Sequence, residues 1–429
     1  MKWLAPLLLS LITPAVFCLG QGTTPVPEQL VLKKALEIAI ANNPGLKAAR
    51  NEIEVAKADR LDATKRLNPA FSLNAEDYRL FSGNQGAFFQ TQEITARLDQ
   101  EIETAGKRRL RTQIADLRMQ AQQAAYEGAV LALSLEVRRA YFQGVLAQTN
   151  VEVSETILQE IDRIVELNRV RLKQGDISGV ELKRVEVERL KFMDDVFAAR
   201  LALANASSTL LTFLGTPLSP TNFRFSETLL ADPNQLASQG GIPPLLALDE
   251  LERQAVAKRP DLKASILEQR RADTETLRQH ALRSPNITVG GGYKRNLNEN
   301  SVVYGVTIPL KIFNRNEGGI ARALAEQERA GNLATQTTNQ ILLEIRKAYN
   351  AVQIHRERVT YIEKESIKKA DETQQIVTAS YRLGGADLIT LLDAERAYRE
   401  TRKLYNQALY DYRMSLYELG TAIGLEAEL

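Results

Sequence analysis

Apolar side chains recur at alternating steps of three and four residues along most of the chain. Helices that pack along a shared seam need this spacing, because it keeps the apolar positions on one stripe. The clearest stripe lies between residues 105 and 173, and small residues at its centre allow a neighbouring helix to approach closely. Its positions are Val130, Leu133, Val137, Ala140, Gly144, Ala147, Val151, Ser154, Leu158, Ile161, Val165, Asn168 and Leu172.

The same spacing predicts three helices in each half of the chain. A run of about 68 residues is about 100 Å long at about 1.5 Å per residue. No compact globule holds such a helix, so we expect it to protrude as part of a bundle or tube. The helices are expected at residues 32–67, 105–173 and 178–214, and again at 248–283, 316–383 and 387–423.

Four shorter segments alternate between apolar and polar residues, which predicts β-strands. Each is about ten residues long, the length of a strand that crosses the outer membrane, with one apolar face and one small or polar face. The polar loops SGNQGAF and NLNEN connect them and are expected outside the cell. The strand segments are PAFSLNAEDYRLF (69–81), TQEITARLDQ (91–100), NITVGGGYKR (286–295) and SVVYGVTIPL (301–310).

The two halves of the chain repeat one another. NNPGLKAAR at residue 42 returns as KRPDLKASI at residue 258, and VRRAY at 137 returns as IRKAY at 345. A period this long indicates a duplicated domain rather than a solenoid unit. We assign residues 21–214 to the first repeat, 215–247 to a Pro- and Gly-rich linker, and 248–429 to the second repeat.

The first 20 residues read as a secretory signal peptide. Lys2 precedes an apolar stretch too short to span a membrane, and Gly20 fits the small-residue cleavage rule. Cys18 is the only cysteine, so the exported chain relies on packing rather than on disulfides. The alternative is a lipoprotein with the lipid on Cys18, although the bulky Phe17 disfavours that signal.

Charge and hydropathy narrow the class of protein. The net charge of +2 provides no basic face for nucleic acid. After the signal peptide, no stretch reaches 18 consecutive apolar residues, so we expect no transmembrane helix. This absence does not exclude a membrane β-barrel built from the four strands, because barrel strands have a weaker sequence signal than membrane-spanning helices.

Strands in a bilayer must close into a barrel, since an open edge leaves backbone groups unpaired in lipid. One chain supplies four strands, whereas single-chain barrels begin at about eight strands. Several chains must therefore share one barrel, and three copies, with about twelve strands, form the smallest one with room for a lumen. The predicted fold is mainly α with a membrane β-barrel.

These features together resemble the TolC family of outer-membrane efflux proteins. The likeness covers nearly the whole chain and includes the two repeated phrases above. It also includes two junctions, QEIETAGKRRLR (100–111) and PLKIFNRNEGG (309–319), and two turns, RLKQGDIS (171–178) and YRLGGADLITLLDAERAY (381–398). The E-x-x-G-K-R form at Glu103 to Arg108 resembles the heavy-metal (CzcC/CusC) branch of the family.

The resemblance implies a homotrimer with a twelve-strand barrel in the outer-membrane lipid and a helical tunnel in the periplasm. The tunnel would dock onto a periplasmic adaptor and an inner-membrane pump. Such a duct is passive, and heavy-metal cations are the expected substrate. The alternatives within this class are drug or organic-solute efflux and type I protein secretion. An alternative of another class is a periplasmic coiled-coil adaptor or scaffold without a pore.

The resemblance also places a gate at the far end of the long helices. Tyr381 and Asp393 match a tyrosine and an aspartate that hold the tip closed. Ala386 and Thr390 depart from the polar gate network, and Asp393 is equally compatible with a solvated or capping charge. The tips that would meet the adaptor, or serve only as turns, contain Gly175, Asp176, Ser178, Gly384, Gly385 and Asp387.

A further candidate region is the junction between strands and helices. Lys107 and the arginines after it are expected near lipid headgroups, or else at a solvated helix start. Asn314 and Glu317 fit a capping box at the matching junction. The residues assigned to this region are Gly106, Lys107, Arg108, Asn314 and Arg315.

The sequence contains no recognisable catalytic set. Its two histidines, His280 and His355, lie far apart, and no Gly-rich phosphate loop is present. We therefore expect no enzyme activity, no cofactor and no bound metal, so a role in metal efflux would rest on conduction.

Overall fold

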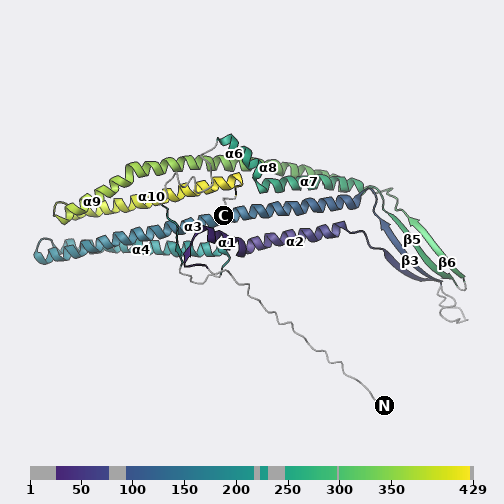
Figure 1. The fold of residues 1–429 in the computed structure, drawn as a ribbon, viewed down its shortest axis with the longest axis horizontal. Coiled ribbons are helices and arrows are strands. Elements are labelled where there is room, and N and C mark those ends of the chain that lie inside the picture. Colours follow the sequence, from purple (N-terminus) through teal and green to yellow (C-terminus); the bar gives the residue numbers. More distant parts are fainter. Residues whose placement is uncertain (1–25, 77–92, 217–222, 230–246, 297–298, 426–429) are drawn as a thin grey trace, which may run out of the picture.

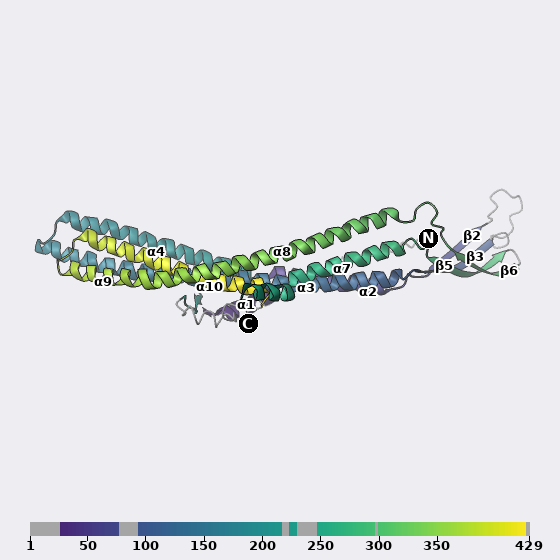
Figure 2. The same cartoon turned by 90° about the horizontal axis from the view of Figure 1, so that it is seen from above.

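The computed structural model describes residues 26–76, 93–216, 223–229, 247–296 and 299–425. The molecule is a long rod of helices with a β-sheet at one end (Figure 1). Two helical hairpins form the opposite end, which we call the tip and define as residues 174–179 and 382–388 (Figures 1 and 2). The expected signal peptide, with Cys18, lies outside the described residues, as does most of the linker.

Each repeat begins with a helix that a proline divides in two. The residue before Pro44 and the residue before Pro260 both leave the helical conformation, because a proline restricts its predecessor to extended backbone. The single helices expected at 32–67 and 248–283 are therefore wrong. The structure has α1 (Leu32–Asn42) and α2 (Pro44–Thr64), then α6 (Leu248–Lys258) and α7 (Pro260–Ala281).

The long helical hairpins agree with the sequence pattern to within a few residues. At their turns, Gly175 and Gly384 adopt φ of 84° and 80°, which favours glycine. Ser178 forms a capping box with Glu181. A π-helical segment interrupts the second hairpin. The elements are α3 (Lys107–Gln174) and α4 (Gly179–Leu214), then α8 (Glu317–Tyr361), η1 (Ile362–Ile367), α9 (Lys368–Arg382) and α10 (Leu388–Ile423).

The four predicted strands form one antiparallel sheet in the order β2-β3-β5-β6, so β3 and β5 join the two repeats. The loop SGNQGAF lies outside the described residues. Asn296 and Glu299 pair within the sheet, so the NLNEN loop is shorter than expected. The strands are β2 (Ala70–Glu76), β3 (Glu93–Ile102), β5 (Ile287–Asn296) and β6 (Glu299–Thr307).

The main apolar core lies halfway along the rod, where α4 and α10 end against α3 and α8. A short parallel pair of β1 (Gln29–Leu30) and β4 (Arg224–Phe225) covers it. Tyr141 donates from Oη to the Leu30 carbonyl at 2.7 Å and stacks edge-on to Phe225. This core holds the two repeats together at their centre.

The exposed apolar surface of α4 is unusual. Among the helices that the structure describes, α4 is the one with a segment long and apolar enough to cross a membrane by length and composition, and 28% of that segment is buried. This weak signal differs from the sequence-based expectation of no such helix. An apolar helix face of this length is expected to be buried against another protein surface, so α4 is a candidate for contact with a second copy of the chain.

Candidate functional site

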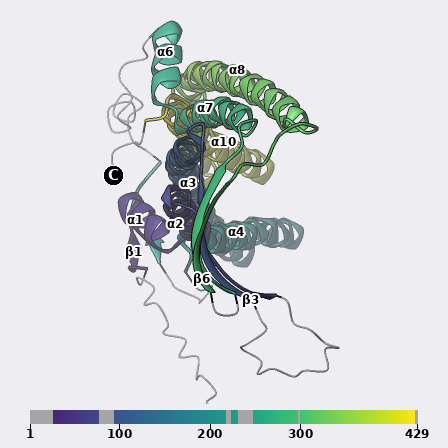
Figure 3. The same ribbon diagram turned by 90° about the vertical axis from the view of Figure 1, so that its right-hand side faces the viewer.

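The helices next to the sheet continue it as a curved wall. Helices α2, α3, α7 and α8 pack side by side in the same order as strands β2, β3, β5 and β6. Figure 3 shows this wall along the rod, with α1 and α6 on its convex side. Among the described helices of this wall, α2 and α8 each have a neighbour on one side, so the wall has two free edges.

The two faces of the sheet differ in chemistry. Phe71, Val302 and Tyr304 lie on the face that carries the apolar side chains, and Tyr304 is 88% exposed to solvent. The other face carries Ser72, Thr95, Arg97, Asp99 and Lys294 by strand alternation. A sheet with one exposed apolar face and one polar face is suited to lipid on the first face and water on the second.

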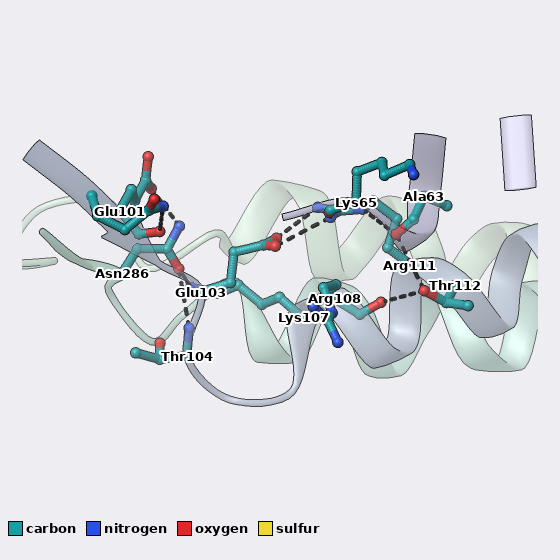
Figure 4. A network of polar contacts seen from close by, with 11 residues as sticks. Ala63, Lys65, Glu101, Glu103, Thr104, Lys107, Arg108, Arg111, Thr112 and Asn286 are labelled. Atoms are coloured by element: carbon teal, nitrogen blue, oxygen red, sulfur yellow. Dashed lines mark hydrogen bonds and ion pairs between the residues drawn. The ribbon is translucent and has the colours of Figure 1, made fainter. Parts of the chain in front are cut away.

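Lys107 fastens the strands to the first long helix. Its Nζ donates to the Ser284 carbonyl at 2.6 Å and to the Asn286 Oδ1, and the side chain is buried (Figure 4). Thr104 Oγ1 donates to the Pro285 carbonyl at 2.5 Å. The expectation that Lys107 reaches headgroups or solvent is therefore wrong, because the second repeat supplies acceptors for its buried ammonium group.

Arg111 ties α2 to α3 at the same junction. It makes a two-point contact with Glu103, at 2.6 and 3.1 Å, and donates to the carbonyls of Ala63 and Lys65 (Figure 4). Arg111 is thus also a structural residue. Arg108 and Arg109 are exposed, so the headgroup expectation continues to apply to them.

The second junction does not form the predicted capping box. The helix begins after Asn316, which has a φ of 65°, and Gly106 has a φ of 69° at the matching place. In this left-handed conformation Asn316 donates to the Gln279 carbonyl at 2.8 Å instead of capping its own helix. Asn314 accepts from the Asn316 N–H, and Glu317 accepts from the Arg315 N–H.

At the tip, Tyr381 is buried and held within its own chain. Its Oη donates to Asn168 Oδ1 at 2.7 Å, and the Arg171 guanidinium lies 5.2 Å from the ring centroid. Arg171 also donates to the carbonyls of Tyr381 and Arg382 at 3.0 Å. Sequence reasoning placed Asn168 on the helical stripe but missed its role. A polar residue at an otherwise apolar stripe position was the available signal.

Asp393 lies on the surface and has a different partner. Its side chain is 63% exposed and accepts from Arg396 at 3.1 Å, and Arg396 also donates to Glu188. Within the described chain, no hydrogen bond joins Asp393 to Tyr381, so the structure does not bring the two expected gate residues together. Asp387 accepts from the Thr390 N–H at 2.8 Å and caps α10, and the glycines of the turns lie exposed.

A buried carboxyl group lies between α9 and α10 near the tip. Glu395 is 1% exposed and accepts from Gln374 Nε2 at 2.7 Å and from Thr378 Oγ1 at 3.3 Å. Burial raises the pKa of Glu395, and the nearby charge of Glu160 adds to this effect. Across the described residues, no group of three or more His, Cys, Asp or Glu side chains is arranged to hold a metal ion.

Known proteins share this architecture. The family model for outer membrane efflux proteins matches residues 35–216 and 251–425. The cobalt-zinc-cadmium resistance protein CzcC of Cupriavidus metallidurans is 24% identical over 88% of this chain and 85% of its own length. The outer membrane protein TolC of Vibrio cholerae is 21% identical over 69% and 68% of the two chains. Crystal structures of CusC match with a TM-score of 0.75 and 18% identity over 92% of both chains.

The family model covers most of the chain and matches once in each half, in agreement with the wall, the two-faced sheet and the paired helical hairpins. The family comprises efflux channels rather than enzymes. The chain therefore belongs to the outer membrane efflux protein (TolC) family, and it resides in the outer membrane with an extension into the periplasm.

Proposed function

We propose that three copies of this chain form one continuous efflux duct. The observation that carries the proposal is the curved wall with free edges at β2 and β6. In the described part of the chain, each of these strands has a partner on one side alone. Such an edge in a bilayer must be paired, and a ring of three walls pairs every edge and encloses a lumen.

The helical edges support the same assembly. The α4 edge exposes Val187, Leu190, Phe197 and Leu201, and the opposite edge exposes apolar side chains of α8, of α9 and of the turn after α9. When the wall closes with rotational symmetry, the α4 edge of one copy meets the opposite edge of the next. The apolar face of α4 is then covered by protein. The residues of the opposite edge are Ile354, Tyr361, Ile376 and Leu383.

The tip is the proposed gate. The hydrogen bond between Tyr381 and Asn168 ties α9 to α3. In the trimer, the exposed Asp393 of each chain would contribute one carboxylate to a set of three. Adaptor docking is assigned to the turns at Gly175, Asp176 and Ser178 and at Gly384, Gly385 and Asp387. An inner-membrane pump would then supply the substrate.

We propose heavy-metal cations as that substrate. Support comes from the relative named for cobalt-zinc-cadmium resistance and from the E-x-x-G-K-R junction. Organic solutes and secreted proteins are the alternatives, because a passive duct leaves selection to the pump. A scaffold without a pore is disfavoured by the exposed apolar face of the sheet, which has no purpose in water.

Planar-bilayer recording of the purified protein tests the duct. We expect discrete conductance steps from the wild type, with more frequent opening in Tyr381→Phe. Correctly assembled protein that gives no steps, in both the wild type and this variant, would contradict the proposal. Transport of metal by cells that contain the matched pump, with and without this chain, tests the substrate.

A further inference from the structure

The polar face of the sheet carries an ion pair that lies flat across neighbouring strands. Arg97 Nε donates to Asp99 Oδ1 at 2.7 Å, and both residues belong to β3. Their side chains are only 28% and 25% exposed, although no described helix packs against the sheet. The charged groups therefore lie against the sheet instead of extending from it.

Two glycines make room for this pair. Gly290 of β5 lies opposite Asp99, and Gly305 of β6 lies opposite Gly290. A Cβ atom at Gly290 would overlap the Asp99 carboxylate, and one at Gly305 would lie 3.3 Å from Arg97 Nη2. Glycine inside a strand marks such a close approach. Arg97 thus reaches across β5 to β6 through a shallow trough with a glycine floor.

The neighbouring charges on this face are engaged elsewhere. Lys294 pairs with Glu93, and Glu101 accepts from Asn286 Nδ2 at 2.6 Å. Arg97 and Asp99 are therefore each other's main electrostatic partner at their level of the sheet. Removal of either one leaves the other as a net charge in the trough.

We propose that the Arg97–Asp99 pair keeps the lumen of the barrel electrically neutral at its level, so that the pore favours neither anions nor cations there, and that by lying flat it keeps the bore wide. This inference rests on the proposed duct, in which the polar face lines the lumen and three copies place three pairs at one level. The intact ring is neutral. Three unpaired like charges in a pore with low-dielectric walls would concentrate the counter-ion and select for it.

Reversal potentials in planar bilayers test the proposal on the full-length protein. With KCl near 0.1 M on the dilute side, where screening extends about 10 Å, Asp99→Asn should shift the permeability ratio towards chloride by about threefold or more. Arg97→Gln should shift it towards potassium by a similar factor. The double variant restores a neutral ring and should return to the wild-type ratio.

Two further variants separate charge from volume. Gly290→Ala displaces the pair into the lumen without a change of charge, so it should lower the conductance and leave the reversal potential unchanged. Glu37→Gln is the matched control, because it removes a carboxylate from the exposed Lys34–Glu37 pair of α1, on the convex side of the wall (Figure 3). Its conductance and selectivity should equal those of the wild type.

The outcomes distinguish this inference from the duct itself. If the wild type conducts and both single variants keep its reversal potential, the pair does not neutralise the lumen and the inference is wrong while the duct stands. If Asp99→Asn or Arg97→Gln does not assemble, Gly290→Ala still tests the proposal, because a conductance equal to that of the wild type would overturn it. If neither the wild type nor Tyr381→Phe conducts, the duct fails, and this inference fails with it.

Discussion

Tyr381→Phe tests the tip most sharply, because it removes one hydroxyl and keeps the ring. The Tyr381 hydroxyl donates to Asn168 Oδ1, and both residues are buried. Asn168 Nδ2 has no hydrogen-bond partner in the described chain, so the variant leaves the whole Asn168 amide without one. The ring and its contact with Arg171 are preserved, which confines the change to a single bond.

The expected loss is that of a buried acceptor without a donor, about 1–3 kcal/mol in each chain. If the bond is present in the closed tip and absent in the open one, this loss shifts the closed-to-open equilibrium. A factor of about 10 for each 1.4 kcal/mol gives about 5- to 150-fold per chain. The double variant Tyr381→Phe with Asn168→Leu removes both partners and should recover much of the thermal stability of the tip.

Single-channel recording measures this shift as open probability. We expect Tyr381→Phe to open far more often than the wild type, and Asp393→Asn to have a smaller effect because Asp393 is exposed and paired only at the surface. Equal open probabilities in Tyr381→Phe and the wild type, with intact trimers in both, would refute the role of this bond in closure.

Three further predictions concern stability, measured by thermal unfolding of the purified protein. Lys107→Met should lower the free energy of unfolding by about 2–4 kcal/mol, because the Ser284 carbonyl and the Asn286 side chain lose their charged hydrogen-bond donor. Arg108→Gln should change it by less than about 0.5 kcal/mol, and equal effects of the two variants would contradict the structural role of Lys107. Gly215→Ala should lower the free energy of unfolding more than Gly424→Ala, although both glycines have positive φ. A Cβ at Gly215 would lie 2.7 Å from the Asn42 carbonyl oxygen, whereas one at Gly424 would lie 3.2 Å from the Arg259 nitrogen, and the reverse order of stability would contradict this packing. Because the folded protein raises the pKa of Glu395, its contribution to stability is fully present below the ordinary carboxyl pKa and is lost as pH rises through the raised value. Glu395→Gln should remove that pH dependence and stabilise the protein at neutral pH, and an unchanged pH profile would count against it.

Much of the fold is readable from the sequence because the helices are long and local. The three-four stripe predicts α3 and α4 nearly to their ends, and Ser178 and Glu181 mark the start of α4 with a capping box. Alternation predicts all four strands because each has one apolar face. The prolines at 44 and 260 are visible in the sequence, yet the helices they divide are predicted as continuous. A proline is tolerated in the first turn of a helix, so the break depends on the extended backbone of the residue before it.

The site was harder to predict because its contacts cross the chain. Tyr381 meets Asn168 at a separation of 213 residues, and Lys107 meets Asn286 at a separation of 179. No pattern within a short stretch of sequence predicts a contact between residues so far apart. The capping box at Asn314 fails for a different reason. A positive φ at Asn316, which asparagine tolerates, turns the side chain towards α7, where its contact with Gln279 is tertiary.

The shared barrel is tested most directly by a cross-link between its free edges. Asn74 of β2 and Ser301 of β6 lie on the polar face, and Cys18 is the only natural cysteine. Because the strands of a closed barrel are staggered, Asn74→Cys is combined in turn with a cysteine at each polar-face position of β6 between Glu299 and Thr307, with Cys18 replaced by serine. With a short bifunctional reagent, at least one of these pairs should give a covalent trimer. The control pair Asn74→Cys with Thr95→Cys, which are register partners, should link within one chain. A product no larger than a monomer from every β2–β6 pair, under conditions in which the control pair reacts fully, would contradict the shared barrel.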